Sequence, residues 1–175
     1  VKIEGTSTLH DWTMESQLVS GKMELDPAFQ LDASLKPGKV NARVAVSIPV
    51  RSLKNGKYAG MDEVMQQAMK EDKFKKIEYR LTELTFKEAP KAADGLYQFD
   101  SKGELIVAGV TNKVSMPVTF FRVSPVRFKV SGSTGLKMTD FGVAPPAPKL
   151  AGGLIKTGDE IKVSFDWVAY TSAKP

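Results

Sequence analysis

The sequence has no cysteine and only one histidine, His10, among its 175 residues. Without cysteine, the chain forms no disulfide and has neither a thiolate nucleophile nor a zinc–thiolate site. A lone histidine is a poor basis for a transition-metal site, because stable sites combine several His, Cys or carboxylate ligands. We therefore expect no metal and no other cofactor.

Long apolar runs and blocks of like charge are absent as well. No segment approaches the ~20 consecutive apolar residues of a transmembrane helix, so we expect no integral membrane segment. The formal net charge of +5 comes from 25 basic and 20 acidic residues that are scattered singly along the chain. Such scatter is typical of a solvated surface and argues against a nucleic-acid partner.

The remaining composition is that of an ordinary globular protein, with 42% hydrophobic and 26% charged residues. We find no internal repeat and no linker that divides the chain. The length and the absence of a linker predict a single domain that spans residues 1–175.

Alternation of apolar and polar residues dominates the sequence and predicts β-strands with one apolar face. In "KVNARVAVSIPV" every even position from Val40 to Val50 is apolar. In "IEYRLTELTF" the apolar phase changes between Leu81 and Leu84, as one extra residue in a β-bulge would allow. With one or two strands in the first 25 residues, the pattern predicts about eight strands. Four further segments alternate in the same way, at residues 97–107, 114–120, 126–138 and 161–167.

One segment has helical spacing instead. In "GKYAGMDEVMQQAMKEDKF" the apolar residues recur at i, i+3, i+4, i+7 and i+8, which predicts one helix over about residues 60–71. Asp62 and Glu63 near its start and Lys70 near its end suit the helix dipole. The proline- and glycine-rich "FGVAPPAPKLAGG" predicts an ordered loop over one end of the sheet. Many antiparallel strands with a single helix indicate either a sandwich or a closed barrel, and periodicity alone does not distinguish them.

His10 lies in "GTSTLHDW", between a leucine and an aspartate. A hydrolytic triad needs a nucleophile and an orienting acid that converge on the imidazole, but His10 has only the adjacent Asp11, and the chain has no GxSxG motif. We expect no catalytic residue. Two interpretations stay open: a histidine hydrogen-bonded at a strand end beside Trp12, or a polar contact at the mouth of a cavity.

Several segments together resemble the YceI-like family of bacterial lipid-binding proteins. The resemblance covers almost the whole chain in the expected order and is carried by "GTSTLHDW", "SIPVRSLKNGKYAGMDEVMQQAMKEDKFKKIEYRLTEL", "GELIVAGVTNKVSMPVTF" and "LKMTDFGVAPPAPKLAGGLIKTGDEIKVSFDW". It implies an all-β fold, namely an eight-stranded antiparallel lipocalin-like β-barrel with the short helix near one barrel end.

The resemblance also implies a function. It implies that the protein, like members of the YceI-like family, holds a long-chain amphiphile in an apolar lumen, such as a polyisoprenoid, an isoprenoid quinone or a fatty-acid derivative. It also implies export to the periplasm or secretion. No signal peptide is recognisable in this sequence, so export is an expectation from the resemblance alone. His10 and Trp12 are the candidates for contact with the polar head. The candidates for the lumen wall are Val44, Val46, Ile48, Met61, Met65, Tyr79, Leu81, Phe99, Val118, Phe120, Phe128, Val130 and Phe165.

Two alternatives remain at this point. In the first, side chains fill the barrel and its outer surface engages a protein partner in the periplasm. In the second, the protein is an enzyme that acts on a lipid, which would require an acidic group such as Asp11, Glu15 or Asp62 beside His10. The sequence leaves a homodimer open and predicts no role for the 26–39 loop.

Overall fold

The computed structural model describes residues 1–26, 29, 31, 35–90, 95–124, 126–147 and 155–170. In these ranges the chain forms ten β-strands, one α-helix and two short 3-10 helices. The strands are β1 (Lys2–Ser7), β2 (Trp12–Glu15), β3 (Ser20–Leu25), β4 (Gly38–Val40), β5 (Ala42–Pro49), β6 (Lys76–Glu88), β7 (Tyr97–Val107), β8 (Val110–Ser124), β9 (Arg127–Lys137) and β10 (Thr157–Tyr170). The helices are η1 (Val50–Ser52), α1 (Ala59–Ala68) and η2 (Thr139–Phe141).

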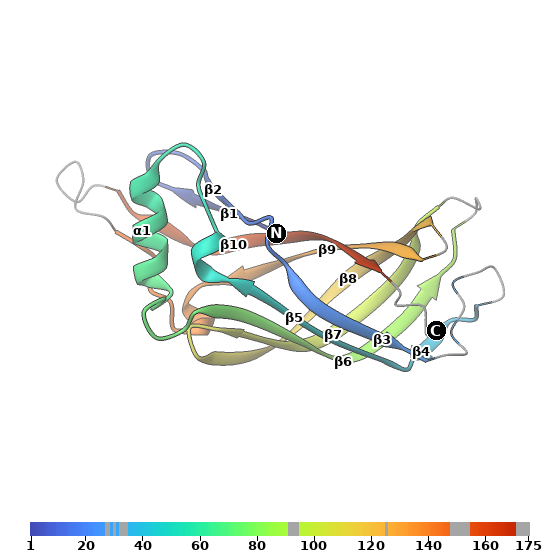
Figure 1. Ribbon diagram of the computed structural model, residues 1–175. Coiled ribbons are helices and arrows are strands. Elements are labelled where there is room, and N and C mark those ends of the chain that lie inside the picture. The colour runs from blue at the N-terminus through green and yellow to red at the C-terminus, as the bar shows by residue number, and fades with distance from the viewer. Residues whose placement is uncertain are drawn as a thin grey trace.

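All the described strands belong to one antiparallel sheet, in the order β2-β1-β10-β9-β8-β7-β6-β5-β3, with β4 also paired to β6. The two ends of this path, β2 and β3, are consecutive in the chain and are joined by residues 16–19. Glu15 and Lys54 exchange two backbone hydrogen bonds of 2.8 Å near this junction. Figure 1 shows the result, an elongated and curled sheet with α1 lying across one end.

The expectation of an all-β antiparallel barrel with one short helix is confirmed, but the count of eight strands is too low. The first 25 residues form three short strands rather than one or two, because the chain turns at residues 8–11 and changes partner from β1 to β5 between Glu15 and Ser20. The three-residue β4, directly before β5, adds the tenth strand.

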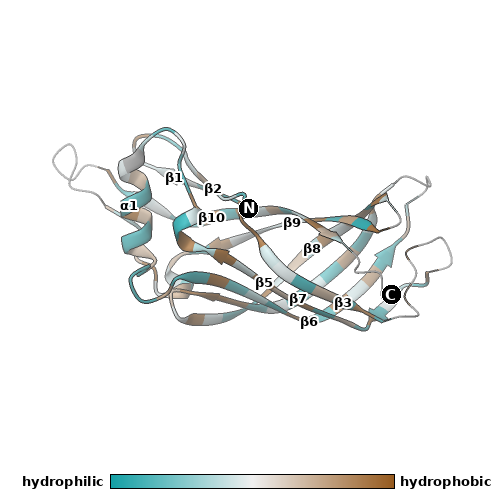
Figure 2. Ribbon diagram, viewed as in Figure 1, coloured by the Kyte–Doolittle hydropathy of each residue, from teal (hydrophilic) through white to brown (hydrophobic). Residues whose placement is uncertain are grey.

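The predicted bulge lies in β6. Leu81 pairs with Gly103 and Glu83 pairs with Lys102, so Thr82 is the extra residue in the register, and its Oγ1 donates a hydrogen bond of 3.0 Å to the Lys102 carbonyl. This insertion keeps the apolar residues on both sides of the bulge on the inner face of the sheet. Figure 2 shows the alternation of apolar and polar residues along the strands that this register preserves.

Helix α1 ends at Ala68, earlier than the predicted end at residue 71. Lys70 takes a left-handed backbone conformation, with φ of 53°, and this stops the helix. The helix is fixed at both ends. At its start, Asp62 accepts a hydrogen bond of 2.8 Å from the Asn55 backbone N–H and pairs with Lys54 at 3.1 Å. Beyond its end, buried Glu71 pairs with Arg51 at 2.9 Å.

The apolar interior differs between the two ends of the barrel. At the end away from α1, aromatic side chains pack closely together, and we call this cluster the aromatic plug; its buried members are Leu31, Leu84, Phe86, Tyr97, Phe99, Val118, Phe120 and Val130. At the α1 end the clusters consist mostly of aliphatic residues and methionines. One contains Met14, Val50, Leu53, Met69 and Ile77, and the other Ala108, Val114, Met138, Phe141 and Val143.

Candidate functional site

A cavity of about 640 Å³ lies inside the curled sheet. Every described strand except β4 contributes to its wall, and five residues of α1 close it at one end: Gly60, Met61, Val64, Met65 and Ala68. The sheet provides this wall because each strand turns one apolar face inward. The volume falls within the range of about 300–1,000 Å³ that is usual for small-molecule sites.

The wall of this cavity is almost wholly apolar. In the part of the chain that the structure describes, no Asp, Glu, Lys or Arg side chain lines it. Its polar side chains are few: Ser7, His10, Trp12, Tyr58, Tyr79, Ser101, Thr134, Thr157 and Trp167. Because burial of an unpaired charge is costly, a wall of this kind admits apolar chains and uncharged groups.

Most of the candidates for the lumen wall do lie on the cavity. Those on the wall are Val44, Val46, Ile48, Met61, Met65, Tyr79, Leu81, Val118, Phe120, Val130 and Phe165, together with the two head-group candidates, His10 and Trp12. Their role in binding stays a prediction. Residues such as Met116, Ile161 and Val163 also line the cavity; the same alternation places them on inner faces, but we did not select them from the sequence.

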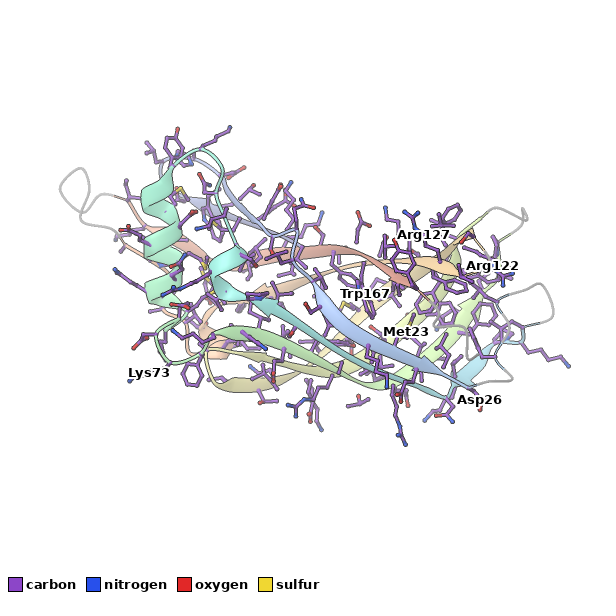
Figure 3. All side chains as sticks on the ribbon, viewed as in Figure 1. Met23, Asp26, Lys73, Arg122, Arg127 and Trp167 are labelled. Atoms are coloured by element: carbon purple, nitrogen blue, oxygen red, sulfur yellow. The ribbon has the colours of Figure 1, made fainter. Side chains whose placement is uncertain are left out.

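Phe99 and Phe128 were predicted to line the lumen, but neither lies on the wall of the cavity. Phe99 is only 1% exposed and packs against Phe86 and Phe120, with ring centroids 5.1 and 4.5 Å away. Phe128 is partly buried and packs against the same cluster, with the guanidinium of Arg122 5.7 Å from its ring centroid. Arg122 lies at the barrel end opposite α1 (Figure 3). Both phenylalanines therefore belong to the aromatic plug rather than to the cavity wall.

The 26–39 loop contributes to this plug. Leu31 is buried in it, and Phe29 and Leu35 pack against it. The ring of Phe29 lies 6.4 Å from that of Phe99, centroid to centroid. Other parts of this loop, residues 27, 28, 30 and 32–34, lie outside the described residues, but its described side chains help to close the end of the barrel away from α1.

His10 lies at the exposed mouth of the cavity. Its ring stacks on that of Tyr58 at a centroid distance of 6.1 Å, and its Nδ1 lies 2.8 Å from the Asp11 carbonyl oxygen, which accepts a hydrogen bond from it. Ser7 Oγ donates a hydrogen bond of 2.7 Å to the His10 carbonyl and accepts one from the His10 N–H. These contacts hold the turn between β1 and β2 in place.

The indole N–H of Trp12 is already hydrogen-bonded within the protein. Its Nε1 donates a hydrogen bond of 3.1 Å to the Thr6 carbonyl, and its ring covers Gly5 on the paired strand so closely that a Cβ there would collide with it. Since the indole has a single donor, Trp12 presents an apolar ring to the cavity and no free hydrogen-bonding group.

The proline-rich segment predicted as a loop lies partly over the α1 end. Phe141 and Val143 are buried there, and Pro146 reaches the cavity. The Thr157 N–H donates a hydrogen bond of 3.2 Å to the Pro146 carbonyl. Residues 148–153 of the predicted loop lie outside the described residues.

Two hydroxyl groups lie on the cavity wall between the plug and α1. Ser101 is buried, and its Oγ donates a hydrogen bond of 3.0 Å to the Met116 carbonyl. The tip of the Tyr79 ring lies over Gly103, where a Cβ would be 2.5 Å from Tyr79 Cζ. Burial raises the pKa of Tyr79, and the neighbouring Ser101 hydroxyl offsets part of this effect. The phenol therefore stays protonated at neutral pH and is a hydrogen-bond donor.

Comparison with known families shows what kind of domain this is. The model of the YceI-like domain matches residues 2–169, which is nearly the whole chain. The chain belongs to the YceI-like family. A comparison with curated proteins gave no significant match.

Solved structures with the same fold are distant in sequence. BcnA from Burkholderia cenocepacia is 18% identical with a TM-score of 0.67, over 96% of this chain and 95% of BcnA. A polyisoprenoid-binding domain from Saccharophagus degradans, implicated in plant cell wall breakdown, is 14% identical with a TM-score of 0.70, over 98% and 92%. A Campylobacter jejuni YceI protein is 18% identical with a TM-score of 0.61, over 91% and 85%. These similarities confirm the lipocalin-like YceI fold.

None of the described helices has the length and apolar character needed to cross a membrane. The described side chains also include no group of three or more His, Cys, Asp or Glu residues placed to hold a metal ion.

Proposed function

We propose that this protein binds a long-chain amphiphilic lipid, such as a polyisoprenoid, an isoprenoid quinone or a fatty-acid derivative, and carries or sequesters it. The observation that carries the proposal is the cavity of about 640 Å³, whose described wall has no Asp, Glu, Lys or Arg side chain. Membership of the YceI-like family and the structural similarity to a polyisoprenoid-binding domain support it. We further propose that the protein acts in the periplasm or outside the cell.

The free energy of binding would come from transfer of the lipid chain out of water. Each buried CH2 contributes about 0.8 kcal/mol, so ten contribute roughly 8 kcal/mol, against an association cost on the order of 4 to 15 kcal/mol. Short chains would therefore bind poorly. Methionines of α1 suit this task, because their flexible and polarizable side chains adapt to a ligand without a fixed shape.

We propose that this function involves no chemical reaction. His10 contacts the Asp11 carbonyl and the Tyr58 ring, whereas Asp62, one of the acids that an enzyme would bring to it, is held by Lys54 and Asn55. These contacts favour a structural role for His10. The alternative of a filled barrel that engages a protein partner would be favoured by a solid lumen, but only the plug end is filled.

The first test is native mass spectrometry of the protein purified from a bacterial host, followed by solvent extraction and identification of what is released. We expect one long-chain lipid per protein molecule, lost on denaturation. A protein that carries no lipid and also takes up no added quinone, polyprenol or fatty amide would contradict the proposal and favour the filled-barrel alternative.

A further inference from the structure

Exposed apolar side chains gather at the barrel end opposite α1. Among the described residues nine large apolar side chains are exposed, and five of them lie at this end: Leu96, Val123, Val126, Val168 and Tyr170. Single exposed apolar residues are normal on a protein surface, but a group of them at one place indicates contact with a protein or a membrane. The register of the sheet shows how these five are arranged.

Lys129 of β9 is the centre of one row across the outer face of the sheet. It pairs with Phe121 of β8 and with Val168 of β10. All three side chains point outward, because the next residue of β9, Val130, points inward into the plug. Leu96 directly precedes β7 and continues this row beside β8. The row is therefore apolar on both sides of a lysine.

A second row lies closer to the end of the barrel. Arg127 pairs with Tyr170, whose side chain is 69% exposed. Val123, at the end of β8, and Val126, in the turn into β9, are 43% and 49% exposed. We call these four residues and Arg122 the tip patch.

The two arginines give the tip patch a positive charge. Arg122 pairs with Phe128, the residue after Arg127, and both arginines lie at the end opposite α1 (Figure 3). Each guanidinium lies 5.7 Å from the centroid of an aromatic ring, and neither pairs with a carboxylate of the described residues. Asp166 borders the patch, but it pairs with Lys129 at 3.1 Å. A guanidinium held over a ring keeps its N–H donors free for an anion.

This combination fits the surface of an anionic bilayer. Arginine donors bind phosphate oxygens of lipid headgroups, while valine and tyrosine side chains enter the apolar boundary beneath them. The net charge of +5 adds a general attraction to such a surface. A stable protein interface buries about 800 Å² on each partner with complementary shape. The tip patch is a single turn with the strand ends beside it, so it suits a bilayer better than a protein.

We propose that the protein docks onto anionic phospholipid bilayers with the tip patch. The arginines bind headgroup phosphates, and the exposed valines and tyrosine enter the bilayer interface. Because α1 and the mouth of the cavity lie at the opposite end of the barrel, the docked protein presents its mouth to the aqueous phase (Figure 1). This docking does not depend on what the cavity binds.

The test measures sedimentation of the protein with vesicles of phosphatidylcholine alone or mixed with phosphatidylglycerol, at low and high salt. The double variant Arg122→Gln/Arg127→Gln removes both charges of the tip patch. Lys57→Gln/Lys156→Gln is the matched control, because it removes the same charge from exposed lysines at the α1 end. Circular dichroism and the unfolding temperature verify that each variant is folded.

We expect the wild type to bind the phosphatidylglycerol vesicles, more weakly at high salt, and to leave phosphatidylcholine vesicles in solution. Each arginine near an anionic surface contributes roughly fivefold in affinity, so the arginine variant should bind about 25-fold more weakly. The lysine variant should lose less than about threefold, since its charges lie well beyond a Debye length of about 10 Å from the docked end.

A second pair of variants tests the apolar contact. Val126→Ser should weaken vesicle binding by about threefold or more, because an inserted valine leaves water on docking. Leu18→Ser changes a side chain that is similarly exposed, at 59%, but lies outside the tip patch, and it should bind vesicles like the wild type.

Several outcomes would overturn the docking. They are a wild type that ignores phosphatidylglycerol vesicles or binds both kinds equally, equal losses from the arginine and lysine variants, and no loss from Val126→Ser. A wild type that ignores both kinds of vesicle would point to an acidic protein as the partner of the arginines instead.

A separate measurement distinguishes docking from binding in the cavity. Trp12 and Trp167 line the cavity, so intrinsic fluorescence reports uptake of geranylgeraniol. Neither Arg122 nor Arg127 lies on the cavity wall, and their double variant should keep the wild-type affinity for this probe. A parallel loss of geranylgeraniol and vesicle binding would overturn the assignment of these arginines to docking alone. A wild type that docks without taking up geranylgeraniol would count against the proposed function and support independent docking.

Discussion

The two ends of the barrel are built from the same alternating pattern but differ in the size of their inward side chains. At the plug end, Phe86, Tyr97, Phe99 and Phe120 meet ring against ring, and two of these side chains are 1% exposed. At the α1 end, the inward residues are mostly valine, isoleucine, leucine and methionine. Large rings on the neighbouring strands β6, β7 and β8 fill the lumen at the plug end, whereas the smaller side chains at the α1 end leave a gap between them. A single sheet thus contains a solid core and a cavity.

The largest effect is expected from Phe99→Ala in the plug. Removal of a fully buried phenylalanine should lower the free energy of unfolding by about 3–5 kcal/mol, because close neighbours cannot fill the space. Urea denaturation followed by circular dichroism measures this change. Tyr58→Ala, at the exposed mouth, is the control and should cost much less. A loss below 1 kcal/mol for Phe99→Ala would contradict a close-packed plug.

Binding should distinguish Phe165 from Phe128. Phe165 lies on the cavity wall, so Phe165→Gln should weaken lipid binding by about tenfold or more, since it places a polar amide against the lipid chain. Phe128 lies off the wall, and Phe128→Gln should change affinity less than threefold in a folded protein. Titration of both variants with the same lipid tests the boundary between wall and plug. Equal losses of affinity would show that the boundary is misplaced.

Acid should loosen the α1 end before the plug. Burial raises the pKa of Glu71, but its hydrogen bonds and charge attraction to Arg51 and Lys75 outweigh this, so the pKa lies below the ordinary value of 4.5. A lowered carboxyl pKa stabilises the folded state above pH 4.5, and this contribution is lost as the pH falls through the folded value. The protection factors of the α1 amides, taken relative to the intrinsic exchange rate at each pH, should therefore fall below pH 4.5 while those of β7 stay high.

Glu71→Gln provides the control for this prediction. The variant has no carboxyl at this position, so exchange in α1 should already be faster at neutral pH and should respond less to acid. An unchanged response to acid would mean that other carboxyl groups hold the helix end.

The smallest effect is expected at the mouth. His10→Ala removes a stacking contact with Tyr58 and one hydrogen bond to a backbone carbonyl, both at the exposed turn. Lipid affinity should change less than threefold, as measured by fluorescence titration. A loss of tenfold or more, with an unchanged unfolding temperature, would place His10 in contact with the lipid head instead.

Sequence reasoning predicted the features that depend on one strand or one helix at a time. Alternation predicted the inner faces of β5 to β10, the change of phase predicted the bulge at Thr82, and the spacing of Met61, Met65 and Met69 predicted α1. These patterns are local, because burial of one face imposes the same period on the sequence as on the structure.

The parts that depend on how strands meet were not predicted. Phe99 and Phe120 both occupy inward positions of the same alternating pattern. Phe99 is enclosed in the plug, whereas Phe120 also lines the cavity, because the curl of the sheet decides which rings meet. Phe29 and Leu31 come from a loop with no periodic pattern. The hydroxyls of Tyr79 and Ser101 come together only through the register of β6 and β7 after the bulge. Pairing of distant segments of this kind leaves no mark in a single sequence.

The width of the cavity also depends on three glycines, which have no side chain. Trp12 lies over Gly5, Tyr79 over Gly103 and Phe165 over Gly132, in each case on a neighbouring strand. A glycine in a strand allows such a close approach, and each ring occupies space that a side chain would otherwise take. These three aromatic residues therefore lie within recesses of the wall. Replacing any of these glycines with a larger residue would push a ring inward and narrow the passage, so the glycines set the width of the lumen as directly as the residues on its wall.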